Sequence, residues 1–191
     1  MPRAGLSSEV VVAEAADVAD EVGHDALTLA ALAARFGVAV PSLYKHVAGL
    51  DDLRRRLALR SVRELGERLA AVTADADDGD AFREMARAYR AYARGHPGRY
   101  AATVRAPGPD DDEHRRATDA VLATVLEVLA AHGVRGDEAI DAARTVRAAL
   151  HGFVALEDAG GFGLPRDVER SFERMIEALE TALRAWSPPA A

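Results

Sequence analysis

The chain has 191 residues, of which 49% are hydrophobic and 29% are charged, and it contains no cysteine. This length fits one domain or two small ones, with enough apolar side chains to form a core. The composition excludes a disordered chain, a fibrous repeat, a disulfide scaffold and any site built on a thiolate. No stretch free of Asp, Glu, Lys and Arg exceeds nine residues, whereas a membrane-spanning helix needs ~20. Because residues 1–8 also lack the apolar segment of a secretion signal, we expect a cytoplasmic protein that makes no membrane contact.

The formal net charge is −7, which argues against a general affinity for polyanions. The charge is unevenly distributed, because residues 35–63 carry seven basic side chains and only two acidic ones. Such a basic run has two interpretations, a nucleic-acid footprint or a solvated helix face. Charge alone favours neither of them.

Glycine and proline recur at intervals typical of helices, and no segment alternates apolar and polar residues as a half-buried strand does. We therefore predict an all-α protein of about nine helices, in which three N-terminal helices are joined by a long helix to a C-terminal helical bundle. The predicted domains are 1–50 and 51–191. The predicted helices, in chain order, run from Ser7 or Ser8 to Gly23, Thr28 to Gly37, Val40 to Gly49, Asp51 to Ala74, Asp80 to Gly95, Tyr100 to Val104, Asp110 to His132, Asp137 to Asp158 and Asp167 to Trp186.

The segment from Thr28 to Asp52 is the most informative part of the sequence. Two short helices can cross at a steep angle when the turn between them takes a positive φ and the residue at the crossing is small. Gly37 and Ala33 meet these needs at helix-turn-helix spacing, and Pro41 suits the first position of the third helix. The outer face of so short a helix stabilises little core, so it is free to enter a DNA major groove. Its residues are Val40, Pro41, Ser42, Tyr44, Lys45 and His46.

The run G-V-A-V-P-S-L-Y-K-H-V, with the helices before it and the following G-L-D-D-L, resembles the TetR family of bacterial transcriptional regulators. The third helix is especially similar to the recognition helix of the tetracycline-repressor type, and the resemblance covers about residues 8–60. A second segment, L-H-G-F-V-A-L-E followed by G-G-F-G, is similar to the regulatory domain of the family. The resemblance implies an N-terminal helix-turn-helix DNA-binding domain followed by a helical ligand-binding and dimerisation domain.

The resemblance also implies which residues contact DNA: the first residues of the third helix approach base edges, its later residues contact phosphates or nearby bases, and the start of the second helix contacts a phosphate. Two positions depart from the family pattern: Ala39 stands where a capping Ser or Thr is common, and Leu50 replaces a lysine that contacts phosphate. Arg54 and Arg55 are candidates to supply that phosphate contact. The implied DNA-binding residues are Thr28, Val40, Pro41, Ser42, Tyr44, Lys45 and His46.

A TetR-like regulator implies three partners: an inverted-repeat DNA operator, a second copy of the chain, and a small-molecule inducer that releases the repressor. Candidate ligand-lining residues are Tyr89, Tyr92, His96, Arg99, Tyr100, Arg105 and His151. The last two helices are apolar over wide arcs, which predicts either a dimer contact or the core of a single chain. The candidate dimer residues are Leu150, Phe153, Val154, Phe172, Ile176, Leu179 and Leu183.

The sequence offers little for catalysis. Its single lysine lies in the expected recognition helix, which excludes a P-loop, and no HExxH motif is present. We therefore predict a protein that is not an enzyme and that binds no metal and no cofactor. A rival interpretation is a helical module that binds a small molecule or a protein but no specific DNA. Ala39, Leu50 and the acidic net charge favour this rival.

Overall fold

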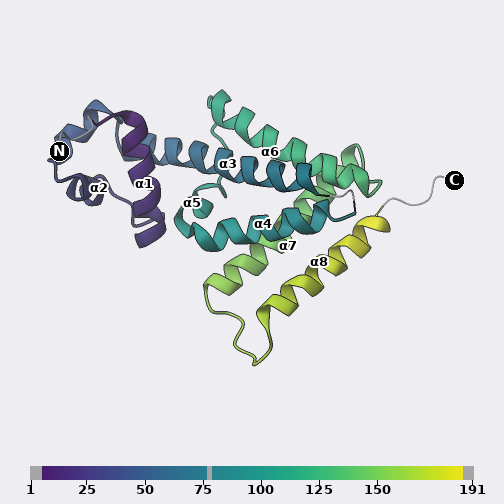
Figure 1. The fold of residues 1–191 in the computed structure, drawn as a ribbon. Coiled ribbons are helices and arrows are strands. Elements are labelled where there is room, and N and C mark those ends of the chain that lie inside the picture. The colour runs from purple at the N-terminus through teal and green to yellow at the C-terminus, as the bar shows by residue number, and fades with distance from the viewer. Residues whose placement is uncertain (1–5, 77–78, 187–191) are drawn as a thin grey trace. The chain divides into compact units, whose positions relative to one another are not determined.

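The computed structural model describes residues 6–76 and 79–186, and within these residues it is built from helices alone (Figure 1). Eight α-helices and one 3₁₀-helix, η1, follow one another along the described chain. The prediction of an all-α protein with about nine helices is confirmed. None of the helices in the described ranges combines the length and the apolar character needed to span a membrane.

The chain folds into two compact units. Unit 1 comprises the residues up to Glu64 and Gly95–Ala117, and unit 2 comprises Leu65–Arg94 and the residues from Thr118 onwards. Two helices, α3 (Leu50–Asp75) and α6 (Asp112–Ala131), contribute residues to both units. The functional division after residue 50 stays a prediction.

Unit 1 is built around α1 (Ser8–Val22), α2 (Leu29–Phe36), η1 (Val40–Lys45) and the first part of α3. Both α1 and α2 begin at side-chain caps, because the oxygens of Ser7 and Thr28 accept hydrogen bonds from backbone N–H groups of the first turn. Gly37 ends α2 with a left-handed φ of 65°, which glycine adopts without strain. The core of these helices includes five fully buried leucines: Leu27, Leu32, Leu43, Leu53 and Leu57.

A short helix of unit 1, α5 (Pro97–Ala102), packs on α1. The approach is close because Gly98 has no side chain: a Cβ there would lie 2.0 Å from the Ala19 carbonyl oxygen. Asp20 holds the same turn, since its carboxylate accepts a hydrogen bond from the Arg99 N–H at 2.8 Å. The side of α1 is therefore fixed against the first turn of α5.

The bounds predicted for this short helix, Tyr100 to Val104, are wrong. The observed helix begins three residues earlier because Pro97 occupies its first turn, where the missing N–H is not needed for helix hydrogen bonding. The sequence prediction treats this proline as a break between helices.

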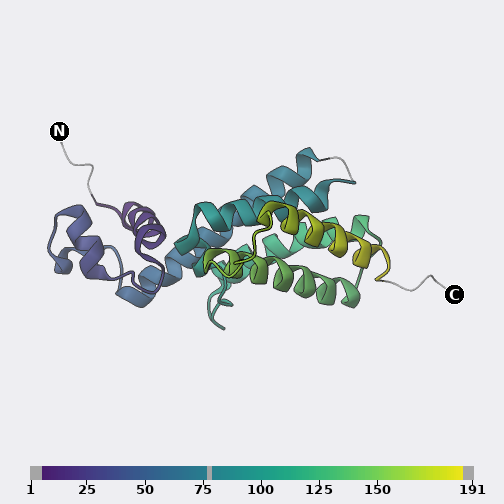
Figure 2. The same ribbon diagram turned by 90° about the horizontal axis from the view of Figure 1, so that it is seen from below.

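Unit 2 contains α4 (Ala81–Gly95), α7 (Asp137–Asp158), α8 (Val168–Arg184) and the remainders of α3 and α6. The bounds of α7 are those that the sequence predicts. Helices α7 and α8 lie side by side in both views (Figures 1 and 2), and contacts near their two ends show that they run antiparallel. Trp186 Nε1 donates to Glu138 at 3.0 Å, and the rings of Phe153 and Phe172 meet at 5.1 Å.

Three arginines of α4 bind glutamates of α7 and α8. The most buried is Arg90, which is 5% exposed and lies over the ring of Phe172 at 4.4 Å from its centroid. The pKa of Glu157 lies below its ordinary value because Arg90 donates hydrogen bonds to its carboxylate. The ion pairs are Arg83 with Glu180, Arg87 with Glu173, and Arg90 with Glu157 and Glu169.

Candidate functional site

The predicted helix-turn-helix is formed by α2, a turn at Gly37 and η1. The Val38 N–H donates to the Ala33 carbonyl at 3.0 Å, which closes the end of α2. The third helix is predicted as α-helical, and the structure shows a six-residue 3₁₀-helix instead. A local feature favours the shorter form: Ala39 offers no side-chain cap to the first turn, and Pro41 fits the first turn of a 3₁₀-helix as well as that of an α-helix.

The 3₁₀ geometry sorts the predicted DNA-binding residues of η1 by side, because residues three apart in such a helix are eclipsed. Leu43 is fully buried, and Val40, three residues before it, packs against the same core. His46, three residues after Leu43, is half-buried.

The other two sides of η1 face outward. Pro41 and Tyr44 share one of them, and Tyr44 is 57% exposed. Ser42 and Lys45 share the other, with Ser42 half-buried and Lys45 exposed. The surface that η1 offers to a partner therefore consists of Pro41, Ser42, Tyr44 and Lys45.

Thr28, the remaining predicted contact, caps α2. Its Oγ1 accepts a hydrogen bond from the Ala31 N–H at 3.1 Å, and the hydroxyl hydrogen can still donate outward. The residue is exposed. Its place at the start of an eight-residue helix fits the predicted phosphate contact.

The arginines of the basic run are engaged inside unit 1. Arg54, a candidate phosphate contact, donates to the Asp25 carbonyl at 3.1 Å. Arg55, the other candidate, donates to both carboxylate oxygens of Asp111 at 2.9 and 3.0 Å and holds the pKa of that carboxyl below its ordinary value. The other arginine pairs are Arg35 with Glu14 and Glu21, Arg56 with Asp52, Arg60 with Glu64, and Arg63 with Glu113.

Of the seven basic residues between Arg35 and Arg63, Arg54 and Lys45 form no ion pair with a described residue, and Arg54 donates to the backbone carbonyl oxygens of Asp25 and Leu27. The basic run therefore leaves Lys45 as the one cation that makes neither an ion pair nor a hydrogen bond with a described residue, rather than a broad basic surface. Sequence reasoning misses this because the partner of Arg55, for example, is 56 positions away in the chain.

The structure does not bring the seven predicted ligand-lining residues together within either unit. Tyr89, Tyr92 and His151 belong to unit 2, where Tyr92 is fully buried and Arg68 lies 5.4 Å from its ring centroid. The members in unit 1 are His96, Arg99, Tyr100 and Arg105.

Two of these unit 1 residues hold α5 on α1. His96 Nδ1 lies 3.2 Å from the carboxylate of Asp20, and the Arg99 guanidinium pairs with Asp17 and Asp20. Tyr100 is buried and Arg105 is exposed. His96 and Arg99 therefore have a structural role, because their contacts fix α5 against α1 and need no ligand.

Most of the predicted dimer residues lie in the core of unit 2. Only Phe153 and Leu179 are partly exposed. The open side of α7 includes residues that the prediction leaves out: Leu156 is 52% exposed, and no atom lies within 4 Å of a Cβ built on Gly152. Apolar periodicity shows which residues form the apolar side of a helix, but it does not show which other helix packs on that side. The buried members are Leu150, Val154, Phe172, Ile176 and Leu183, each at most 4% exposed.

Known proteins are similar to this chain in sequence and in fold. The family model described as tetracyclin repressor-like, C-terminal domain matches residues 82–179. The HTH-type transcriptional regulator Rv0681 of Mycobacterium tuberculosis is 45% identical over 158 residues, which cover 82% of this chain and 72% of the relative. The HTH-type transcriptional regulator YobS of Bacillus subtilis is 31% identical over 183 residues, 95% of each chain.

A solved structure extends the likeness to the fold as a whole. A TetR variant from Acinetobacter baumannii AYE, crystallised in complex with minocycline, matches with a TM-score of 0.71 at 22% identity, over 96% of this chain and 100% of that one. The two relatives are named HTH-type transcriptional regulators, which agrees with the helix-turn-helix of unit 1, and the family model matches residues that follow this motif. The chain belongs to the TetR family of helix-turn-helix transcriptional regulators.

Proposed function

We propose that this regulator is a repressor that binds an inverted-repeat DNA operator as a homodimer and is released from it by a small molecule. The observation that carries the DNA-binding part is the outer surface of η1. Pro41, Tyr44 and Lys45 are exposed there, while Leu43 anchors the segment in the core of unit 1. A segment anchored in this way presents its outer side chains to a major groove in fixed positions.

The two outward sides of η1 suit different parts of the DNA. Pro41 and the ring of Tyr44 offer apolar surface, which is suited to thymine methyl groups. Ser42 and Lys45 offer a hydroxyl and an ammonium group, which are suited to phosphates. Val40 packs against the core, so its contribution is to hold η1 in place rather than to read bases.

The homodimer would form through the open sides of α7 and α8. Gly152 allows a close approach of another helix because nothing occupies the space beside it, and Leu156 supplies exposed apolar surface. Phe153 and Leu179 border this surface. A symmetric pair formed in this way would place its two η1 segments on half-sites one DNA turn, about 34 Å, or a multiple of it apart.

Induction by a small molecule is supported by the fold and by the composition of unit 2. The Acinetobacter TetR variant, which has this fold, holds minocycline. In unit 2 the aromatic and polar side chains of Tyr89, Tyr92 and His151 remain the candidates to line a ligand cavity between helices.

Fluorescence anisotropy with the DNA upstream of the chain's own gene tests the DNA-binding part. The double variant Tyr44→Ala, Lys45→Ala should bind about tenfold more weakly or worse, because it loses base and phosphate contacts together. Arg116→Ala is the matched control, since Arg116 is an exposed cation of unit 1 that forms no ion pair with a described residue. Equal binding by the double variant and the parent would reject the proposed interface. Binding of no sequence above the non-specific level at low salt would favour a helical module that binds a small molecule or a protein.

Light scattering tests the dimer separately. Leu156→Glu should give a monomer, because a charge would be buried between the two copies. Leu164→Glu is the control, since Leu164 is 81% exposed in the connection between α7 and α8. A dimer of unchanged mass in the Leu156 variant would place the contact elsewhere.

A further inference from the structure

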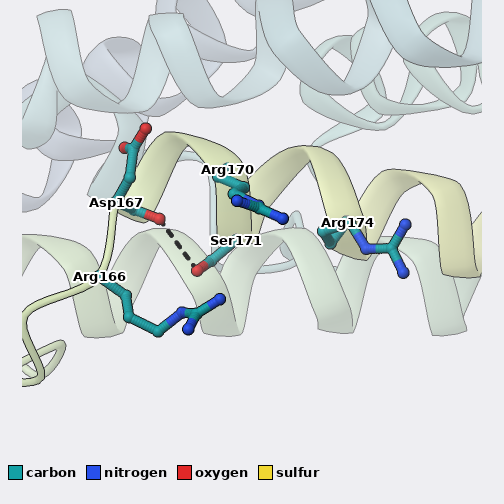
Figure 3. A pocket seen from close by; sticks show the side chains of 5 residues that line it. All are labelled: Arg166, Asp167, Arg170, Ser171 and Arg174. Atoms are coloured by element: carbon teal, nitrogen blue, oxygen red, sulfur yellow. Dashed lines mark hydrogen bonds between the residues drawn. The ribbon is translucent and has the colours of Figure 1, made fainter.

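A row of arginines at the start of α8 lines a pocket of about 580 Å³ (Figure 3). Arg170 and Arg174 are four residues apart in α8 and share one side of the helix at a spacing of about 6 Å along its axis, and Arg166 lies just before the N-cap Asp167. Figure 3 shows the Arg166 side chain extending alongside α8 in the direction of Ser171. The lining residues are Arg166, Asp167, Arg170, Ser171 and Arg174.

These arginines differ from the arginines of α4. The arginines of α4 each contact a glutamate of α7 or α8. Neither Arg166 nor Arg170 forms an ion pair with any of the residues that the structure describes, 6–76 and 79–186. Arg174 pairs only with Glu177, one turn away on its own helix, and its side chain is 74% exposed. Two of the three arginines therefore have no carboxylate partner among the described residues.

A shortage of acidic residues does not explain why Arg166 and Arg170 lack carboxylate partners, because unit 2 contains 18 acidic residues and 12 arginines. Like charges four residues apart on a helix repel one another, and Arg170 and Arg174 of α8 are such a pair. Asp167 is the one acidic residue of the pocket, and its carboxylate already caps α8 by accepting the Glu169 N–H at 2.9 Å. The formal charge of the pocket is +2.

The geometry points to a binding site for an oligophosphate, either free or as the phosphate chain of a nucleotide. A guanidinium group binds phosphate oxygens in pairs, and three guanidinium groups around one pocket match a chain of phosphates better than a single phosphate. The volume lies within the range of about 300–1,000 Å³ that is usual for small-ligand sites. A hollow of this kind favours a small ligand over a flat protein surface.

The site stays open in the proposed dimer. Arg170 and Leu179 are nine residues apart, which is two and a half turns, so they lie on opposite sides of α8. A second copy that covers Leu179 leaves the arginine row exposed. The pocket residues belong to unit 2 and η1 belongs to unit 1, so a variant can lose oligophosphate binding while DNA binding is kept, or the reverse.

Isothermal titration calorimetry of the full chain with sodium tripolyphosphate at low salt tests the site. We expect saturable binding, weakened about tenfold or more in the double variant Arg166→Gln, Arg170→Gln, because two charge-assisted contacts are lost. The control Arg144→Gln, Arg184→Gln removes the same charge from unit 2 at side chains that are 77% and 65% exposed and that pair within their own helices. It should bind as the parent does.

Further titrations identify the ligand and give the outcomes that overturn the proposal. ATP that binds more tightly than tripolyphosphate assigns a nucleotide, and equal affinity assigns the phosphate chain itself. Orthophosphate that binds as tightly as tripolyphosphate, or equal weakening in the site and control variants, refutes a built site. If the Arg166, Arg170 variant instead loses affinity for the upstream DNA, the row belongs to the DNA-binding surface and the small-ligand site is rejected.

Discussion

Replacing Gly98 by alanine tests the closest helix contact of unit 1. The added Cβ would lie 2.0 Å from the Ala19 carbonyl oxygen, 2.1 Å from its carbonyl carbon and 2.6 Å from the Asp20 nitrogen, whereas ordinary contacts begin at 3.4 Å. All three atoms belong to the backbone of α1, so none of them can rotate away. Helices α1 and α5 must separate by roughly 1 Å or more, which close-packed interiors resist. We expect the free energy of unfolding to fall by about 3 kcal/mol or more.

Urea denaturation followed by far-UV circular dichroism measures this loss. Gly95→Ala is the matched control, because nothing lies within 4 Å of a Cβ at that position, and its unfolding free energy should stay within about 0.5 kcal/mol of the parent. The separation of α1 and α5 would also stretch the hydrogen bond from the Arg99 N–H to Asp20. If Gly98→Ala unfolds at the same urea concentration as the parent, α5 does not pack on α1 as described.

Three further predictions concern charge. Lys45→Ala removes the free cation of η1 from each copy, so the slope of log affinity against log salt concentration should become shallower by about 1.8 for a dimer. Fluorescence anisotropy over a salt series measures this slope. An unchanged slope contradicts a phosphate contact of Lys45. Burial lowers the pKa of His114 below its ordinary value of 6.5, so the unfolded chain takes up the proton first and stability falls as the pH drops below 6.5. In His114→Phe the urea midpoint should therefore change less between about pH 7.5 and 5.5 than in the parent. Arg90→Leu removes both hydrogen bonds to the Glu157 carboxylate and should cost about 3 kcal/mol. Because Arg90 lowers the pKa of Glu157 from 4.5, the parent loses stability below pH 4.5, and an acid titration of the variant should show less of that loss.

Those features of the fold that depend on neighbours in sequence could be predicted from the sequence. The caps at Ser7 and Thr28 and the left-handed Gly37 each require a residue type within one turn of where it acts, and all three are observed. The bounds of α7 follow from acidic residues in its first turn and glycines after its last. The 3₁₀ form of η1 could not be predicted, because Pro41 fits the first turn of an α-helix and of a 3₁₀-helix equally.

Features that depend on which helix faces which could not be predicted. Phe172 and Ile176 form an apolar stripe whether another helix of the same chain or a second copy covers it, and the structure buries both within unit 2. The same limit applies to charge, since the carboxylate that engages Arg55 lies far along the chain on the residue before α6. Periodicity shows which residues share a helix face, but it does not identify the segment that packs against that face.

The pairing of the arginines bears on how an acidic regulator could select its operator. Phosphate contacts attract a protein to all DNA sequences alike, and their number sets the non-specific affinity. If Arg55 were to bind a phosphate, it would first have to leave the two carboxylate oxygens of Asp111. With Lys45 as the free cation of η1 and a net charge of −7 on the chain, non-specific binding should be weak. Contacts of Pro41 and Tyr44 with base edges would then account for a larger share of the total affinity, which raises the ratio of specific to non-specific binding rather than the affinity itself.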